Sequence, residues 1–442
     1  MTRSPGCDPA ALTVSPDDLV PHLPAYLARQ RWFGAKERVL TDVAVGDLEA
    51  LAAGPPGLVR CFADASFADG GRARYHVLLG LRPFSDPTFT TSDDDAIATV
   101  DTPDGPVLAY DAVADPELCL ELLGLAAPGE AATTVRRLGA EQSNSSVVYD
   151  DRVILKVFRH LRPGPNPDVA TVQALAATGF DRTPAPVGVW RQAGYDLAFV
   201  QRFLPGGAEG WQLAVDSVNA GGDFSADAAA VGAVTARLHQ AMATAFGVEA
   251  ADPVRWAEEL ETELASTPHP HLQAPAATRL VRSLRTIEDP GPAMRIHGDY
   301  HLGQVMRTPD GWFVLDFEGE PARPVEERLR PSSPLRDVAG MLRSFQYASM
   351  VASVAGDGDE HGAAPSATSG REWEVRAREA FLSAYLATAD HALLPAAASD
   401  RITLLNAFEL QKAAYEVRYE QSHRPQWGYI PLEAISRLVP AG

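Results

Sequence analysis

The spacing of apolar residues changes along the chain, and it predicts where strands and helices lie. Between residues 40 and 112 apolar and polar residues alternate, which is typical of strands with one buried face. Two such strands are predicted at Leu58–Phe62 and Arg74–Leu79, joined by a glycine-containing turn. Short amphipathic helices are predicted at Leu23–Trp32 and Asp111–Leu125. We therefore expect a β-rich N-terminal region.

The next section combines strands with one helix. Strands are predicted at Ser146–Tyr149, Val153–Phe158 and Leu197–Phe203, and a helix at Val169–Thr178. A segment rich in Pro and Gly separates the second strand from the helix. The first two strands are close enough in sequence to form a hairpin.

Helical spacing dominates from Ala226 onward. It is interrupted by the acidic stretch Arg295–Pro321 and by the low-complexity segment Gly356–Gly370, which is expected to be a mobile loop. A chain of 442 residues is too long for one ordinary core. Two or three domains are therefore expected, and the changes of pattern divide the chain into a β-rich N-terminal region of residues 1–112, an intermediate region of residues 113–205 and a helical C-terminal region of residues 206–442.

Composition excludes several classes of protein. With 46% apolar and 22% charged residues, the chain is typical of a soluble globular protein. Its formal charge of −20 argues against a nucleic-acid partner and against docking on anionic membranes. It contains no run of 18 apolar residues and no signal-peptide core, so a cytoplasmic protein is expected. The scattered Cys7, Cys61 and Cys119 argue against a disulfide framework or a zinc site.

Arginine supplies almost all of the positive charge. Of 38 basic residues, only Lys36, Lys156 and Lys412 are lysines. Where such a chain keeps a lysine, the compact charge of an ammonium group can be needed in place of a planar guanidinium. Composition therefore marks three positions for inspection.

A hairpin rich in small polar residues precedes Lys156. The segment Leu138–Tyr149 can cover phosphates with its backbone N–H groups and with the side chains of Ser143, Asn144 and Ser145. Lys156 lies in an otherwise apolar strand, where a charge is costly unless a partner such as a nucleotide phosphate compensates it. The alternative is a surface lysine on an edge strand. A P-loop is excluded, because the sequence G-x-x-x-x-G-K-[ST] is absent.

The stretch Arg295–Pro321 carries the second set of candidate residues. Asp299, in a tight loop, can orient a substrate hydroxyl and accept its proton. The amide oxygen of Gln304 and the carboxylate of Asp316, at the end of the next strand, can hold Mg²⁺ against nucleotide phosphates. Glu318 is a candidate for an auxiliary metal contact. Such chemistry needs hard oxygen ligands and in-line positioning more than a strong nucleophile.

Two other interpretations of this stretch compete. His297 and His301 could bind zinc, but they lack the helical H-E-x-x-H context and a third ligand. The stretch could also be a solvated structural loop. The combination of a strand lysine, then Asp299, Gln304 and Asp316 in this order, favours a small-molecule phosphotransferase with a protein-kinase-like site.

Several long stretches resemble actinobacterial maltokinases and their aminoglycoside-phosphotransferase-like relatives. They are Ala140–Leu155, His297–Gln304, Leu315–Pro321, Pro334–Phe345, Phe408–Glu420 and Arg424–Trp427. The early Arg31–Gly34 resembles the start of the N-terminal cap of those enzymes. The resemblance spans nearly the whole chain.

The resemblance implies an α+β, bilobal protein-kinase-like fold of the aminoglycoside-phosphotransferase type. An N-terminal β-rich cap would be added to it, and the C-terminal lobe would be mostly helical. Lys156 would bind the phosphates of ATP, and Asp299 would be the catalytic base. Gln304, where other kinases carry Asn, and Asp316 would be the magnesium ligands.

Two further roles are carried over from the family. The segment Gln201–Leu204 would be the hinge that holds adenine, with Gln201 and Phe203 as its expected contacts. Asp337 resembles the acid that braces the catalytic loop.

Three departures from the family pattern stand out. Ala170 occupies the position of the glutamate that should pair with the strand lysine, and Asp168 or Glu141 could replace it. Tyr300 stands where maltokinases usually have Leu, and Gln411 where they usually carry an acid. The last two changes are expected on or near the sugar pocket.

The segment Phe408–Glu420 is predicted to present acids on one helical face. Glu409, Lys412, Glu416 and Glu420 are spaced at helical period, and acids there could accept hydrogen bonds from sugar hydroxyls or balance an ammonium group. A solvated helix surface is the alternative. Trp427 could stack on a sugar ring or lie in the core. The expected substrate contacts are Asp299, His301, Glu409, Gln411, Glu416, Glu420 and Trp427.

Chains of this architecture also resemble glucosamine kinases. The changes at Tyr300 and Gln411 favour D-glucosamine, phosphorylated on its 6-hydroxyl by Mg-ATP, over maltose, phosphorylated to maltose 1-phosphate. An aminoglycoside phosphotransferase and an inactive kinase fold that serves as a binding module are the remaining alternatives. A sugar-binding enzyme that acts as a monomer or homodimer is expected.

Overall fold

The computed structural model describes residues 14–103, 105–139, 143–320, 323–355 and 367–440, and it divides the chain into two compact units. Unit 1 comprises residues up to Val169 together with Ala185–Pro205, and unit 2 comprises Ala170–Pro184 together with Gly206–Gly442. Each is described by itself. The division of unit 1 into a cap and a nucleotide-binding lobe stays a prediction.

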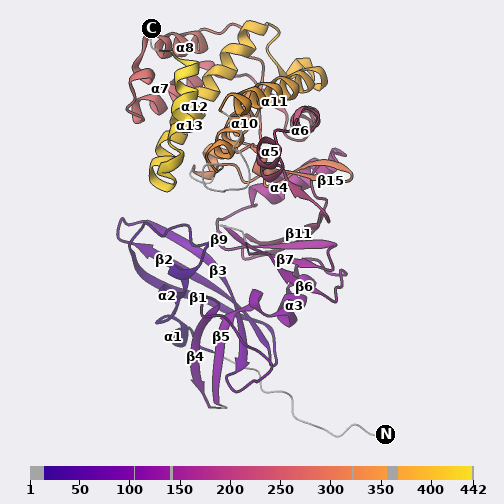
Figure 1. The fold of residues 1–442 in the computed structure, drawn as a ribbon. Helices are drawn as coiled ribbons and strands as arrows, with labels where there is room; N and C mark the ends of the chain where they lie inside the picture. The colour runs from indigo at the N-terminus through magenta and orange to yellow at the C-terminus, as the bar shows by residue number, and fades with distance from the viewer. Residues whose placement is uncertain (1–13, 104, 140–142, 321–322, 356–366, 441–442) are drawn as a thin grey trace. The chain divides into compact units, whose positions relative to one another are not determined.

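Unit 1 contains most of the strands (Figure 1). Its helices are short, namely α1 (Pro16–Leu19), α2 (Leu23–Arg29), the 3₁₀ turn η1 (Ala112–Ala114) and α3 (Pro116–Ala126). The strands of its first sheet are β1 (Leu40–Ala52), β2 (Gly57–Phe67), β3 (Arg72–Pro83), β4 (Ala96–Thr102), β5 (Gly105–Asp111) and β9 (His160–Leu161). The strands of its second sheet are β6 (Val135–Arg137), β7 (Asn144–Tyr149), β8 (Val153–Phe158), β10 (Pro186–Gln192) and β11 (Tyr195–Arg202).

The two sheets of unit 1 are antiparallel. The first has the order β1-β2-β3-β5-β4, with β9 paired to β3, and the second has the order β10-β11-β8-β7-β6. Because β9 follows β8 directly in sequence but pairs with β3, the chain itself ties the two sheets together. The predicted strands at residues 58–62, 74–79 and 153–158 all lie within β2, β3 and β8.

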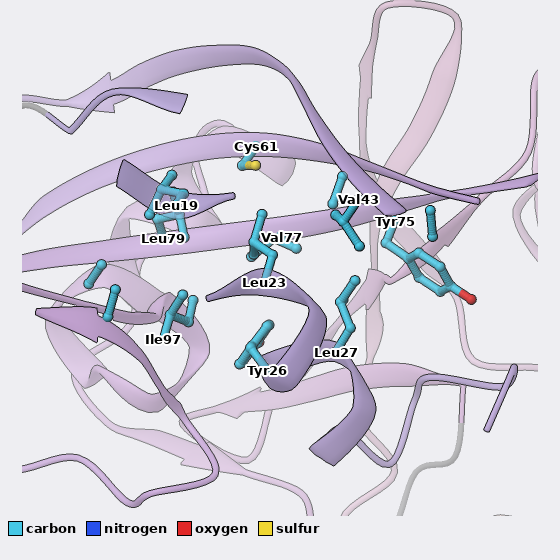
Figure 2. Close-up of a cluster of buried hydrophobic side chains, with 14 of the residues drawn as sticks. Leu19, Leu23, Tyr26, Leu27, Val43, Cys61, Tyr75, Val77, Leu79 and Ile97 are labelled. Carbon is cyan, nitrogen blue, oxygen red and sulfur yellow. The ribbon is translucent and has the colours of Figure 1, made fainter. Parts of the chain in front are cut away.

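One face of the first sheet is covered by α1 and α2 (Figure 2). Ser15 and Asp18 form a capping box that starts α1. Leu23, Tyr26 and Leu27 of α2 are fully buried against apolar side chains of β2 and β3. This amphipathic packing explains the predicted N-terminal helix, which ends at Arg29 and is shorter than expected.

Unit 2 is mostly helical. Its helices are α5 (Gly210–Asn219), α6 (Ser225–Phe246), α7 (Pro253–Ser266), α8 (Pro275–Arg285), α9 (Val325–Arg328), α10 (Leu335–Ala355), α11 (Ala367–Thr388), α12 (Ala398–His423) and α13 (Tyr429–Leu438). Its 3₁₀ turns are η2 (Pro270–Gln273), η3 (Leu302–Gln304), η4 (His391–Leu393) and η5 (Pro425–Trp427). Helix α4 (Pro167–Ala177) begins in unit 1 and continues in unit 2.

Two small sheets complete unit 2. One is β12-β15-β16 and the other is β13-β14, with the strands β12 (Ala208–Glu209), β13 (Val248–Glu249), β14 (Ala293–Met294), β15 (Val305–Thr308) and β16 (Gly311–Val314). Part of the expected loop at 356–370 lies outside the described residues, and its last four residues begin α11. None of the helices in the described ranges has the length and hydropathy that a membrane span needs.

Candidate functional site

The loop after β14 is held by a buried carboxylate of α10. Asp337 accepts hydrogen bonds from the backbone N–H of His297 at 2.8 Å and of Gly298 at 2.9 Å. Gly298 has φ +83°, a left-handed conformation that glycine adopts without strain. His239 of α6 lies 3.2 Å from the same carboxylate through Nε2, and 2.9 Å from the hydroxyl of Tyr385 through Nδ1. The backbone of the loop is therefore fixed by side chains of two helices.

The side chains that flank Asp299 in sequence point into the protein. His297 contacts the carbonyl of Leu315 at 2.9 Å through Nε2, and its Nδ1 lies 3.4 Å from the N–H of Asp299. The hydroxyl of Tyr300, a residue only 3% exposed, lies 2.8 Å from that of Thr235. His297 is thus committed to bracing the loop, as expected for a structural histidine. Asp299 itself keeps a side chain that is 19% exposed.

Two groups flank the carboxylate of Asp299. Nζ of Lys412, from α12, lies 3.5 Å from Oδ1, and Nε2 of His301 lies 3.8 Å from Oδ2. Burial lowers the pKa of His301, which favours the neutral ring. Because its Nδ1 accepts a hydrogen bond from the N–H of Gly303, the proton of the neutral ring is on Nε2, facing Asp299. The partly exposed carboxylate of Asp299 thus has an ammonium group on one side and an imidazole N–H on the other.

Gln304 and Asp316 lie side by side at the base of the β15–β16 hairpin. The N–H of Leu315 donates to the carbonyl of Gln304 at 2.9 Å. Because Asp316 directly follows Leu315, its backbone lies close to that of Gln304. Asp316 has φ +60°, an uncommon conformation for a non-glycine residue that often marks functional sites. The N–H of half-buried Glu318 lies 3.4 Å from Oδ1 of Asp316. Asp316 and Glu318 thus share the turn after β16, and the backbone of Gln304 pairs with Leu315, the residue before Asp316.

This set of donors fits magnesium better than zinc. Amide and carboxylate oxygens are hard ligands, and Mg²⁺ in kinase sites takes only one or two carboxylates, with phosphates and waters completing its shell. Within the described residues, no group of three or more His, Cys, Asp or Glu side chains is arranged to hold a metal ion. Both ring nitrogens of His297 face backbone groups. The zinc alternative therefore has no support in the structure.

In unit 1, Lys156 pairs with Asp168. Nζ of Lys156 lies 3.2 Å from Oδ2 of Asp168, whose side chain is 1% exposed. Asn166 starts α4 by accepting a hydrogen bond from the N–H of Asp168 at 2.8 Å, which fixes the acid in the first helical turn. Of the two acids considered for this pairing, Glu141 lies outside the described residues. The strand lysine is partly buried, so it is not an edge-strand surface residue.

The strand pairing sorts the polar residues of the hairpin onto two faces. Ser146 lies opposite Lys156 in the β7–β8 register and shares its face, as does Asn144 by alternation. Ser145 points the other way, is 5% exposed, and accepts a hydrogen bond from Nε of Arg159 at 2.9 Å. This placement conflicts with the expectation that its hydroxyl binds phosphate. Ser143, also an expected phosphate contact, is exposed.

The expected hinge begins in the last two residues of β11 and continues just beyond the strand. Gln201 is buried and lies opposite Ile154 of β8, which places it on the face of the sheet that carries Lys156. The N–H of Phe203 donates to the carbonyl of Arg152 at 2.9 Å. The N–H of Phe203 is therefore committed to chain pairing, and adenine recognition at this residue would have to use its carbonyl.

The acids of α12 form buried ion pairs. Glu409 lies 2.9 Å from Arg378 and 3.4 Å from Arg437, while Glu416 lies 2.9 Å from Nε of Arg343. These two carboxylates are therefore neither a solvated surface nor free acceptors for a sugar.

The remaining expected sugar contacts of this region are also engaged. Glu420 is 1% exposed and accepts hydrogen bonds from Arg424 at 2.8 and 2.9 Å. Gln411, 4% exposed, accepts one from Arg336 at 2.8 Å. Trp427 is half-buried, with the guanidinium of Arg424 4.3 Å from the centre of its ring. Tyr300 and Gln411, the departures that were expected on the sugar pocket, are thus both buried and bound to protein groups.

Sequence reasoning missed two residues near the expected chemistry. Lys412 contacts Asp299 and also Glu320, at 2.9 Å, and the scarcity of lysine had marked it without assigning it a role. The hydroxyl of Ser146 is buried with no hydrogen-bond partner among the described residues, beside Lys156 in the sheet. Side chains alternate between the two faces of a strand, and applying this rule to the hairpin would have placed Ser146, and not Ser145, on the face of Lys156.

Known proteins match this chain over most of its length. A family profile for the "Phosphotransferase enzyme family" matches residues 134–364, and one for the "Maltokinase N-terminal cap domain" matches residues 26–115. Glucosamine kinase of Mycolicibacterium smegmatis is 34% identical over 335 residues, which cover 70% of this chain and 80% of that protein. Glucosamine kinase of Streptacidiphilus jiangxiensis is 32% identical over 356 residues, which cover 74% and 78% respectively.

Solved structures confirm the predicted fold class. Glucosamine kinase in crystal form B matches with a TM-score of 0.66 at 24% identity, over 97% of this chain and 100% of that one. A glucosamine kinase in complex with glucosamine, ADP and inorganic phosphate matches with a TM-score of 0.64 at the same identity and coverage. The α+β, protein-kinase-like fold expected from the sequence is thus observed. Since the phosphotransferase profile spans just over half of the chain, and both curated relatives are covered over most of their length, the chain belongs to the phosphotransferase enzyme family.

Proposed function

We propose that this phosphotransferase transfers the γ-phosphoryl group of Mg-ATP to D-glucosamine, giving D-glucosamine 6-phosphate and ADP. The observation that carries the proposal is the identity of 34% and 32%, over at least 70% of this chain, to two curated glucosamine kinases. The placement of Asp299 in a braced loop, with its carboxylate partly exposed, supports transfer to an alcohol.

Asp299 is the proposed base. Its carboxylate accepts the proton of the sugar hydroxyl as the hydroxyl oxygen forms a bond to the γ-phosphorus. The bond from that phosphorus to the bridging oxygen breaks, and ADP leaves with the electron pair. His301, neutral and with its Nε2–H facing Asp299, is placed to hydrogen-bond the carboxylate or the incoming hydroxyl. Asp299 later releases its proton to solvent.

Gln304 and Asp316 would hold magnesium, with Glu318 as an auxiliary contact. Magnesium, when bound, supplies positive charge that neutralises the phosphates during transfer. Lys156, oriented by Asp168, would bind the phosphates as a point charge. Asn144 and the backbone of the hairpin would assist it, and Gln201 and Phe203 would lie at the adenine.

The proposal of glucosamine as the acceptor rests on the similarity to the curated relatives and not on individual pocket residues. Tyr300 and Gln411 cannot select a sugar by direct contact while they are buried and bound to Thr235 and Arg336. The cap-domain match keeps maltose as a second candidate acceptor, since that profile is described for maltokinases. Five residues are still proposed as substrate contacts, although each would have to exchange or share its present protein partner to bind a sugar. They are Glu409, Gln411, Glu416, Glu420 and Trp427.

A coupled assay of ADP release, with glucosamine, maltose and a panel of aminoglycosides in parallel, tests the proposal. We expect turnover with glucosamine and a product phosphorylated on O6, identified by ³¹P and ¹³C NMR. Asp299→Asn should lower kcat by roughly 10³-fold or more, because it removes the base. Asp310→Asn, on the exposed β15–β16 turn, is the matched control. Turnover of maltose without turnover of glucosamine would reject glucosamine as the substrate.

A further inference from the structure

Lys412 connects the last long helix to the catalytic loop. Its Nζ lies 2.9 Å from Oε1 of Glu320 and 3.5 Å from Oδ1 of Asp299. Glu320 is in turn paired with Arg323 at 2.7 Å, and its side chain is 10% exposed. Glu320 is therefore anchored from two sides, and it fixes the position of the Lys412 ammonium.

The ammonium is held in its charged form. Burial alone would disfavour the charge, but the carboxylates of Glu320, Asp299 and Glu416 together raise the pKa of Lys412 above its usual value. The ring of Tyr415 lies 5.2 Å from Nζ, so the ammonium also has an aromatic neighbour. The neighbouring carboxylates therefore favour the ammonium form of Lys412 over the neutral amine.

A carboxylate that serves as a base must present one oxygen to the acceptor hydroxyl. In Asp299, Oδ1 faces Lys412 and Oδ2 faces Nε2 of His301, at 3.5 and 3.8 Å respectively. A partial rotation of the carboxylate about its Cβ–Cγ bond would move Oδ1 away from the ammonium. A group whose geometry must be kept to within a fraction of an ångström benefits from such a fixed partner.

We propose that Lys412, anchored by Glu320, is a positioning residue that holds Oδ1 of Asp299 and so leaves Oδ2, on the His301 side, for the acceptor hydroxyl. The inference rests on the proposed function only in taking Asp299 as the base that accepts the hydroxyl proton. It applies to any alcohol that the enzyme phosphorylates. It also gives roles to Lys412 and Glu320, two residues that have no part in the proposed reaction as described above.

The test compares substitutions of two ion-paired cations on the same helix. Lys412→Met removes the ammonium, and Lys412→Arg keeps a cation of different shape. Arg418→Met is the matched control, because Arg418 is also on α12, pairs with Glu263 of α7, and has a side chain 37% exposed against 30% for Lys412. We expect Lys412→Met to lower kcat by roughly 10²-fold, with each KM changed less than about threefold, and Arg418→Met to leave kcat within about twofold. Lys412→Arg should restore part of the loss.

Glu320→Gln and chemical rescue separate positioning from general structural support. Glu320→Gln keeps Lys412 but loosens its anchor, and it should lower kcat by roughly tenfold. In Lys412→Ala, added ethylammonium should recover part of kcat, whereas tetramethylammonium, which has no N–H group, should not. Circular dichroism and thermal unfolding show whether each variant folds.

Several results would overturn the inference. A Lys412→Met variant with normal kcat and a raised KM for the acceptor would make Lys412 a ground-state substrate contact. A folded Lys412→Ala variant that amines do not rescue would show that Lys412 only stabilises the structure. The same conclusion would follow if Lys412→Met lost no more kcat than Arg418→Met. Absence of wild-type turnover with glucosamine contradicts the proposed function alone, and the comparison is then made with the alcohol that the wild type does phosphorylate.

Discussion

Nζ of Lys156 lies 3.2 Å from a carboxylate oxygen of Asp168, two residues before Ala170, the position at which the family resemblance predicts the partner glutamate. The acid has moved within the first turn of α4, and Asn166 caps that turn. Asp168 therefore supplies the acidic partner of Lys156 that the family resemblance predicts at Ala170, and it does so with a shorter side chain. The alanine at position 170 therefore gives no reason to regard the protein as an inactive kinase fold that serves only for binding.

Asp168→Asn should impair use of ATP. The substitution removes the charge that orients Lys156, and a hydrogen bond to a charged group is worth about 1.5–3 kcal/mol, so kcat/KM for ATP should fall roughly 10- to 100-fold. Asp151→Asn is the control, because Asp151 forms a surface pair in which its side chain is 66% exposed. Initial rates at varied ATP concentration measure the effect. Equal kinetics for both variants would contradict the assigned pairing.

His76 should make unit 1 sensitive to acid. Burial and the charge of Arg159 lower the pKa of His76 from 6.5 to about 3, so the folded protein keeps it neutral while the unfolded chain binds a proton. The free energy of unfolding should therefore fall as pH drops from 6.5 towards 3, by up to about 1.4 kcal/mol per pH unit from this group.

His76→Asn tests this linkage. Nδ1 of His76 lies 3.3 Å from the carbonyl of Phe158, and the Asn amide can donate from a similar position. Urea unfolding between pH 7 and pH 4 should show a shallower loss of stability in the variant than in the wild type. His22→Asn, at an exposed position, should leave the slope unchanged. Parallel curves for wild type and His76→Asn would refute the prediction.

Gly340 of α10 should tolerate no side chain without moving the loop that carries Asp299. A Cβ at this position would lie 2.6 Å from the carbonyl oxygen of Tyr300, a backbone atom next to Asp299. Gly340→Ala should therefore displace the loop, lower kcat at least tenfold and cost about 1–3 kcal/mol of stability. Activity and calorimetry on the same sample measure both effects.

Gly124 of α3 offers the opposite case. No atom lies within 4 Å of a Cβ built there, so Gly124→Ala should be neutral or should stabilise the helix by up to about 1 kcal/mol. A loss of kcat in Gly124→Ala comparable to that in Gly340→Ala would show that the effect does not come from the contact with Tyr300.

Glu409→Gln should destabilise unit 2. The carboxylate has a side chain 3% exposed and lies between Arg378 and Arg437, and breaking a buried pair of this kind costs about 3 kcal/mol or more. Glu433→Gln removes an acid from a surface pair with Arg371 and should cost less than about 1 kcal/mol. Thermal unfolding of the two variants checks the difference. A raised KM for the sugar with unchanged stability would instead place Glu409 in the substrate pocket.

Local pattern predicted much of unit 1 because its strands and turns follow from short-range rules. The strand at Val153–Phe158 coincides with β8, and the turn between residues 68 and 72 joins β2 to β3. Composition alone predicts Ser145 as a phosphate contact, because it does not show which face of the hairpin a residue lies on. In the structure its hydroxyl accepts a hydrogen bond from Arg159, fourteen residues away, and only the fold shows that the two meet.

The helical lobe was harder to interpret because a helical period identifies a face without identifying what covers it. Glu409, Lys412, Glu416 and Glu420 do share one face of α12, as predicted. The groups that cover that face come from distant segments, such as Arg343 of α10 and Arg378 of α11. Whether an acid meets solvent, a sugar or an arginine depends on such tertiary contacts, which no local pattern contains.

The scarcity of lysine has a consequence for the chemical modification of this protein. Acylation, whether by reactive metabolites or by amine-directed reagents, has only three side-chain targets in 442 residues. Lys36 is exposed, whereas Lys156 and Lys412 are engaged with Asp168 and with Asp299 and Glu320. In a protein with many exposed lysines, such reagents modify many equivalent amines on the surface. Here a second or third acylated lysine would be a residue assigned to phosphoryl transfer, so the number of acylated lysines would itself report on inactivation.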